Sequence, residues 1–231
     1  TGNLEQKQIF WIVALLVLFG HIMLFSASGI LGVQRHQSEF YFISRQAAAA
    51  LAGFCLLVLL SVVKLNFLRA IALPLILCQI ALVGLTYVPG FGHHAGGATR
   101  WLRIAGFVFQ PSEGAKITVS IYLAAILAKN QIVPFSAKKW VILLTPLFIL
   151  LGLIFKQPDM GTTVLLSATI LALFFVAGVK LTYVVATIAI GAVGFVAAML
   201  HSEYRRKRLL AFLNPWADPQ GTGFQTIQSF V

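Results

Sequence analysis

The chain has 231 residues, of which 59% are hydrophobic and only 10% charged, and its formal net charge is +11. A soluble domain needs roughly a quarter of its residues charged, so this composition excludes an ordinary soluble domain. The apolar residues form long blocks, and a helix of about 20 apolar residues matches the hydrocarbon thickness of a bilayer. Because backbone polar groups in lipid must be satisfied within the element, we predict an all-α, polytopic transmembrane helix bundle.

Seven apolar blocks follow one another along the chain. They run approximately over 9–28, 46–63, 70–88, 111–128, 140–155, 161–178 and 181–200. Tight turns at 64–69 and 179–180 contrast with a long connection at 89–110, which is rich in glycine and histidine, and with a polar tail at 201–231. We therefore predict a single transmembrane domain over 1–231 with seven visible spans. Because the chain starts at Thr1 without a methionine and ends at Val231 without a structural stop signal, we expect a fragment.

Basic residues do not follow the positive-inside rule in this arrangement. With a cytoplasmic N-terminus, 64–69 and 129–139 lie inside, whereas 89–110 and 201–231 are extracytoplasmic loops. The inner side would hold Lys7, Lys64, Arg69, Lys129, Lys138, Lys139 and Lys180, and the outer side Arg35, Arg45, Arg100, Arg103, Lys156, Arg205, Arg206, Lys207 and Arg208. Either the topology is inverted or the outer charge is functional. We favour function, because long loops often carry binding residues.

The stretch just before the fourth block carries a candidate binding motif. Arg100 and Arg103 bracket Trp101 after two glycines. The planar guanidinium of arginine suits phosphate, and tryptophan suits the headgroup level of a bilayer. An interfacial anchor explains the same residues, and the motif alone does not decide between the two interpretations.

Two helix starts share a second pattern. Gln110-Pro111 opens the fourth block with Glu113 and Lys116 one turn apart, and Gln157-Pro158 opens the sixth with Asp159. Ionisable side chains inside a membrane are costly and usually face a cavity or a partner. Helix capping for the carboxylates, and a simple ion pair for the lysine, are the structural alternatives. We expect both starts to form one cavity in which the three charged side chains converge.

The remaining polar features indicate little chemistry. Residues 201–213 form a short basic helix suited to a membrane surface, or a cytoplasmic anchor. The adjacent His93 and His94 have no cysteine or acidic neighbour, and Cys55 and Cys78 lie in apolar blocks. We therefore predict no metal site, no visible cofactor and no nucleic-acid partner.

Four motifs together resemble those of the FtsW/RodA, or SEDS, family. They are Gly-Ala-Thr-Arg-Trp-Leu-Arg at 97–103, Phe-Gln-Pro-Ser-Glu-x-Ala-Lys at 109–116, Gln-Pro-Asp-Met-Gly-Thr at 157–162 and Asn-Pro-Trp-x-Asp-Pro-x-Gly-x-Gly-Phe-Gln-x-x-Gln-Ser at 214–229. The Asn-Pro-Trp form is more similar to the FtsW division branch than to the RodA branch. The resemblance implies ten transmembrane helices, a cytoplasmic N-terminus and a large outer loop that includes 201–231.

The resemblance also implies an activity. A family member polymerises lipid II into peptidoglycan strands at the outer face of the bacterial plasma (inner) membrane during cell division. Its partners would be a class B penicillin-binding protein (a transpeptidase), other division proteins and membrane lipid. The substrate-binding candidates in this chain are Arg45, Arg100, Trp101, Arg103, Glu113, Lys116 and Asp159. A lipid II flippase or a non-catalytic division scaffold would suit the same charges.

Two departures from the family pattern bear on this expectation. The chain has Gly114 where the family carries phenylalanine, which loosens the first helical turn. The family's essential aspartate lies in a Pro-Glu-x-His-Thr-Asp-Phe motif that would follow Val231. The catalytic residue is therefore unknown here, and the fragment alone is expected to be inactive. A divalent metal would help the pyrophosphate leave, but no residues in the chain support a site for one.

Overall fold

The computed structural model describes residues 2–95, 98–104, 107–130, 136–157, 159–201, 214–217, 219–221 and 223–230. The chain divides into two compact units, Thr1–Leu65 and Asn66–Val231. Each of the seven predicted apolar blocks lies on a helix, so that part of the prediction is confirmed.

The first unit is an antiparallel pair of helices, α1 (Gly2–His36) and α2 (Tyr41–Ser61). Ring contacts join both ends of the pair: Phe10 lies 5.8 Å from Phe54, and Phe25 stacks on Phe40 at 5.5 Å between centroids. No residue of α2 is buried. Two apolar helices whose surfaces are exposed in this way are suited to contact with membrane lipid.

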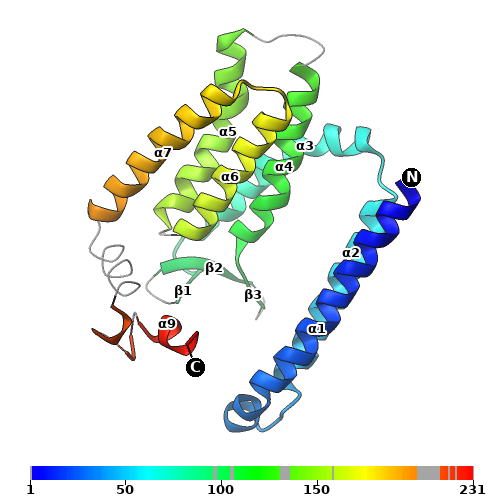
Figure 1. Ribbon diagram of the computed structural model, residues 1–231, viewed down its shortest axis with the longest axis vertical. Helices are drawn as coiled ribbons and strands as arrows, with labels where there is room; N and C mark the ends of the chain where they lie inside the picture. Colours follow the sequence, from blue (N-terminus) through cyan, green and yellow to red (C-terminus); the bar gives the residue numbers. More distant parts are fainter. Residues whose placement is uncertain are drawn as a thin grey trace. The chain divides into compact units, whose positions relative to one another are not determined.

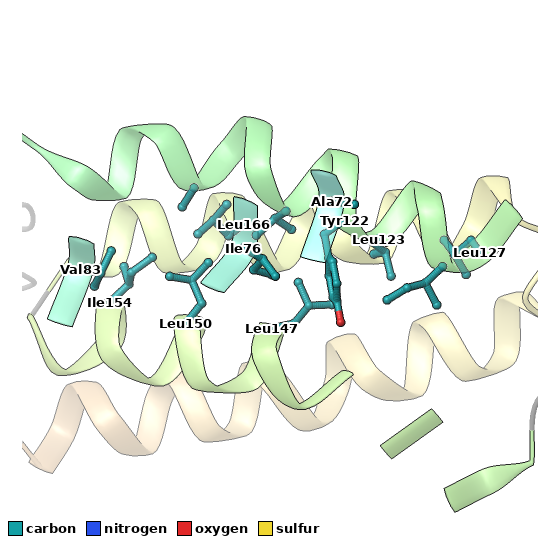
Figure 2. Packing of buried hydrophobic residues seen from close by; sticks show 13 residues of the cluster. Ala72, Ile76, Val83, Tyr122, Leu123, Leu127, Leu147, Leu150, Ile154 and Leu166 are labelled. Atoms are coloured by element: carbon teal, nitrogen blue, oxygen red, sulfur yellow. The ribbon is translucent and has the colours of Figure 1, made fainter. Parts of the chain in front are cut away.

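The second unit is a helix bundle (Figure 1). Its helices are α3 (Leu65–Leu85), α4 (Pro111–Asn130), α5 (Ala137–Lys156), α6 (Met160–Val176) and α7 (Leu181–His201). Helix α6 packs against α4, α5 and α7. Figure 2 shows the core between these helices, where Ile76, Leu123, Leu150 and Leu166 are fully buried.

A small antiparallel sheet lies at one end of this bundle (Figure 1). Its strands are β1 (Gly92–Ala95), β2 (Ala98–Ile104) and β3 (Phe107–Phe109), in the order β1-β2-β3. The all-α prediction is wrong for this segment, whereas its assignment as an extracytoplasmic loop stays a prediction. Its glycines and histidines suggested a loop, but β2 alternates the buried Leu102 with the exposed Arg103, as a half-buried strand does.

Five helices are long and apolar enough to cross a membrane, within the described part of the chain. They contain the spans Lys7–Gln34, Tyr41–Ser61, Leu65–Leu85, Lys138–Lys156 and Leu181–His201. Helix α6 is apolar but has only 17 residues, and α4 opens with a polar first turn. The protein is thus a mostly helical membrane protein with several spanning helices, and the seven-span count stays a prediction.

Within its described residues, the tail contributes two short elements. A 3-10 turn, η1 (Pro215–Ala217), is followed by α9 (Phe224–Gln228), and the two are in contact. The predicted basic surface helix lies mostly at 202–213, outside the described residues.

Candidate functional site

The candidate site is built where the sheet meets the starts of α4 and α6. Residues 101–103 of β2 alternate between its two faces, whereas Arg100 is the extra residue where the pairing with β1 shifts register. Leu102 is fully buried, and Arg100, two residues earlier, donates from Nε to the carbonyl oxygen of Gln157 at 3.1 Å. Gln157 is the C-cap residue of α5. Arg100 therefore fastens the sheet to the end of a core helix.

The opposite face of β2 carries Trp101 and Arg103. Trp101 is half-buried and lies opposite His93 in the register, whereas Arg103 is exposed and lies opposite Val108. Residues directly opposite on antiparallel strands share one face. This face of the sheet therefore presents an indole ring and a guanidinium group side by side along one strand.

The start of α6 is organised by a buried carboxylate. Asp159 is only 6% exposed and is the N-cap of α6, where its Oδ1 accepts from the backbone N–H of Thr162 at 3.3 Å. Its Oδ2 accepts from Gln110 Nε2 at 2.8 Å and from Ser112 Oγ at 3.3 Å. The carboxylate thus joins the starts of α4 and α6 into one hydrogen-bonded group.

The start of α4 also carries an exposed ion pair. Lys116 Nζ donates to Glu113 Oε2 at 2.6 Å, and the two side chains are 37% and 58% exposed. Pro111 begins the helix at a position where a missing N–H costs nothing. This pair is accessible to a bound ligand, unlike Asp159.

The predicted convergence of three charges is only half correct. Helices α4 and α6 are neighbours, as expected. Among the described residues, however, Lys116 pairs with Glu113, while Asp159 accepts hydrogen bonds from neutral groups. The starts hold two polar groups and not a single charged cluster, because Gln110 and Ser112 satisfy the buried carboxylate.

Sequence reasoning missed a set of buried polar side chains that support this end of the bundle. Gln79 donates from Nε2 to the carbonyl oxygen of Pro111 at 2.7 Å, and Gln157 Nε2 lies 2.5 Å from Thr86 Oγ1. A Cβ on Gly114 would lie 3.0 Å from Oε1 of Gln79. The available signal was an amide inside the apolar block 70–88.

Tyr87 contacts the end of α5. Its Oη donates to the carbonyl oxygen of Leu153 at 2.6 Å, and Lys156 Nζ lies 5.6 Å from its ring centroid. Burial raises the pKa of the Tyr87 phenol above its ordinary value, so this hydroxyl stays a neutral donor at physiological pH.

Arg45 is the one predicted binding residue in the first unit. It lies on α2 with its guanidinium carbon 4.7 Å from the Tyr41 ring centroid. Its role in binding stays a prediction, as do those of the other six candidates. Pro158, which opens the second helix start in the sequence, lies outside the described residues.

Comparison with known proteins gives one consistent result. The family model described as cell cycle protein, FtsW/RodA/SpoVE, matches residues 6–231. The chain is 36% identical to the probable peptidoglycan glycosyltransferase FtsW of Geobacter sulfurreducens, over 94% of this chain and 58% of the relative. It is 34% identical to that of Geobacter metallireducens, over 99% of this chain and 63% of the relative. The chain thus spans about three-fifths of these relatives' length.

A solved structure is also similar. It is titled "Structural coordination of polymerization and crosslinking by a peptidoglycan synthase complex" and matches with a TM-score of 0.60 at 27% identity. The match covers 91% of this chain and 63% of the solved chain.

Proposed function

This chain belongs to the FtsW/RodA/SpoVE family of cell cycle proteins, and on that premise we propose that the full-length protein is a peptidoglycan glycosyltransferase. Its substrate would be lipid II, polymerised at the outer face of the bacterial plasma membrane during cell division. The names of the relatives and the Asn-Pro-Trp form at 214–216 support the division role.

The observation that carries the proposal is the charge at the sheet end of the second unit. Arg103 is exposed on β2, and Lys116 is partly exposed on α4. The Asp159 carboxylate is buried and already accepts hydrogen bonds. It therefore does not neutralise the basic side chains that a ligand would contact. The exposed Glu113 carboxylate offsets the charge of Lys116, so the net accessible charge of these side chains is the positive charge of Arg103. A guanidinium suits a pyrophosphate, and a bound pyrophosphate would compete with Glu113 for the lysine.

These residues suit distinct parts of glycosyl transfer. In the proposed reaction the 4-hydroxyl oxygen of the acceptor sugar attacks the anomeric carbon of the donor, and the polyprenyl pyrophosphate leaves. Lys116 and Arg103 would stabilise charge that develops on the leaving pyrophosphate. Trp101 offers an aromatic face for a sugar, and Glu113 sets the position of the lysine. The base that accepts the hydroxyl proton is not assigned.

The same proposal includes a topology and a partner. Seven helices would cross the membrane, with the N-terminus cytoplasmic and the sheet and tail outside. A class B penicillin-binding protein would cross-link the product, and the polymerisation and crosslinking named in the solved complex support that pairing.

Polymerisation of purified lipid II by the full-length protein, with its cognate transpeptidase, tests the function. Glycan strands should form and should persist when the transpeptidase active site is blocked by a β-lactam. A parallel assay follows lipid II flipping in proteoliposomes. Flipping without polymerisation would contradict the enzyme proposal and support the transporter alternative. If the protein shows neither activity, the scaffold alternative would be supported.

A further inference from the structure

A second basic site lies at the far end of the second unit from the sheet. An open pocket of about 440 Å³ is lined by the beginning of α3, the end of α4 and the beginning of α5. Because the sheet connects the end of α3 to the beginning of α4, this pocket is at the opposite end of the bundle (Figure 1). It is therefore separate from the candidate glycosyltransferase site.

The lining of the pocket combines exposed cations with apolar walls. Arg69, Lys129 and Lys139 are exposed basic residues, one on each of the three helices, and the described residues that line the pocket include no acidic one. The apolar lining includes Ile126 and Leu143. These three residues bring like charge from three different helices to one pocket, and a bound anion would offset their mutual repulsion.

The polar side chain among the described residues of the apolar wall already has a hydrogen-bond partner. Tyr122 lines the pocket, and its Oη donates to the carbonyl oxygen of Leu143 at 2.8 Å. The wall therefore offers an apolar contact rather than a set of hydrogen-bond donors. The volume is in the range of about 300–1,000 Å³ that is typical of sites for small ligands.

We propose that this pocket binds an anionic glycerophospholipid of the surrounding membrane. The phosphate would lie among the three basic side chains, and the part of an acyl chain nearest the headgroup would pack on the apolar wall. Basic pockets between transmembrane helices suit anionic lipid headgroups in this way. A free phosphate or other soluble anion would use the cations but gain nothing from the wall. The inference depends on the protein being embedded in a membrane and not on the proposed enzymatic activity.

Lipid retention by the full-length protein tests the proposal. The protein is delipidated in detergent, incubated with equal amounts of phosphatidylglycerol and phosphatidylethanolamine, and examined by native mass spectrometry. The wild type should retain phosphatidylglycerol preferentially. The double substitution Arg69→Gln, Lys129→Gln should lower that retention on the order of thirtyfold, since each basic residue near an anionic membrane surface contributes about fivefold.

The matched control removes the same charge from the same end of the bundle. Lys138 and Lys180 are exposed, and neither lines the pocket. Lys138→Gln, Lys180→Gln should retain phosphatidylglycerol like the wild type. Equal retention by the pocket variant and the control variant would overturn the proposal.

Two further arms identify the occupant. The substitution Ala125→Phe places a ring against the apolar wall and should lower phosphatidylglycerol retention with all three cations present. Undiminished retention would reduce the site to an electrostatic contact and contradict the acyl-chain part. A photo-crosslinking residue in place of Ile142, which also lines the pocket, should give a lipid adduct. A crosslink to another segment of the protein would show that protein covers the pocket and would also overturn the proposal.

Discussion

The starts of α4 and α6 have the same local sequence pattern and different environments. Each begins with Gln-Pro and places a carboxylate in or beside the first turn. Asp159 is 6% exposed and accepts hydrogen bonds from three groups, whereas the Glu113 side chain is 58% exposed and pairs with Lys116. The comparison shows that one carboxylate holds the scaffold together and the other lies where a ligand can reach it.

The largest expected effect is the loss of activity when Lys116 is neutralised. Lys116→Met removes the accessible cation without opening the core, so polymerisation of lipid II by the full-length protein should fall on the order of a hundredfold. Lys116→Arg keeps the positive charge but replaces a compact ammonium with a planar guanidinium, so it should retain only a small part of the wild-type activity. Thermal unfolding should remain close to that of the wild type. Full activity of Lys116→Met would show that the lysine has no role in the reaction.

A large effect of a different kind is expected at Asp159. Asp159→Ala leaves the donors of Gln110, Ser112 and Thr162 without their buried acceptor, so the free energy of unfolding should fall by about 3 kcal/mol. Glu113→Ala removes a carboxylate from an exposed pair and should cost less than about 1 kcal/mol. Unfolding in mixed detergent and lipid micelles measures both. Equal losses would contradict the distinction between the two helix starts.

The sheet allows a similar comparison at intermediate magnitude. Trp101→Ala and Arg103→Ala should each lower polymerisation about tenfold, as expected for one lost contact of roughly 1.4 kcal/mol, with normal insertion and expression. Arg100→Ala should instead lower stability, because its guanidinium holds the sheet to Gln157. Loss of expression in step with activity for Trp101 and Arg103 would return both to a role as interfacial anchors.

The smallest effect concerns the glycine in the first turn of α4. A side chain at Gly114 would place its Cβ 3.0 Å from Gln79 Oε1, so Gly114→Phe should destabilise the protein by about 1 kcal/mol. Gln79→Ala should recover part of that loss in the double variant, because it removes the obstructing amide. Additive losses in the unfolding experiment would show that the two positions are independent.

Sequence patterns were sufficient for the helices and insufficient for the sheet. Long apolar blocks have few alternatives in a membrane, so every predicted block lies on a helix. The strand containing Leu102 and Arg103 is short, and its pairing partners lie in a segment whose composition is typical of loops. Local composition does not specify which segments pair, because the hydrogen bonds of a sheet are made between separate stretches.

The candidate site was located from sequence but its internal pairing was not. Both Gln-Pro motifs indicated the correct helix starts, and helical spacing indicated the Glu113–Lys116 pair. The partners of Asp159 depend on how α4 and α6 pack, and the position of Gln79 over Gly114 depends on α3. Such contacts between helices have no signature in the spacing of residues along one of them.

The most direct test of the central claim exchanges the two members of the exposed pair. The full-length variant Glu113→Lys, Lys116→Glu keeps an ion pair at the same helical spacing, so its free energy of unfolding should stay within about 1 kcal/mol of the wild type. If Lys116 acts on the pyrophosphate, lipid II polymerisation by this variant should remain as low as that of Lys116→Met at equal folded amounts. Recovery of polymerisation toward the wild-type rate would show that the pair is only structural and would contradict the account.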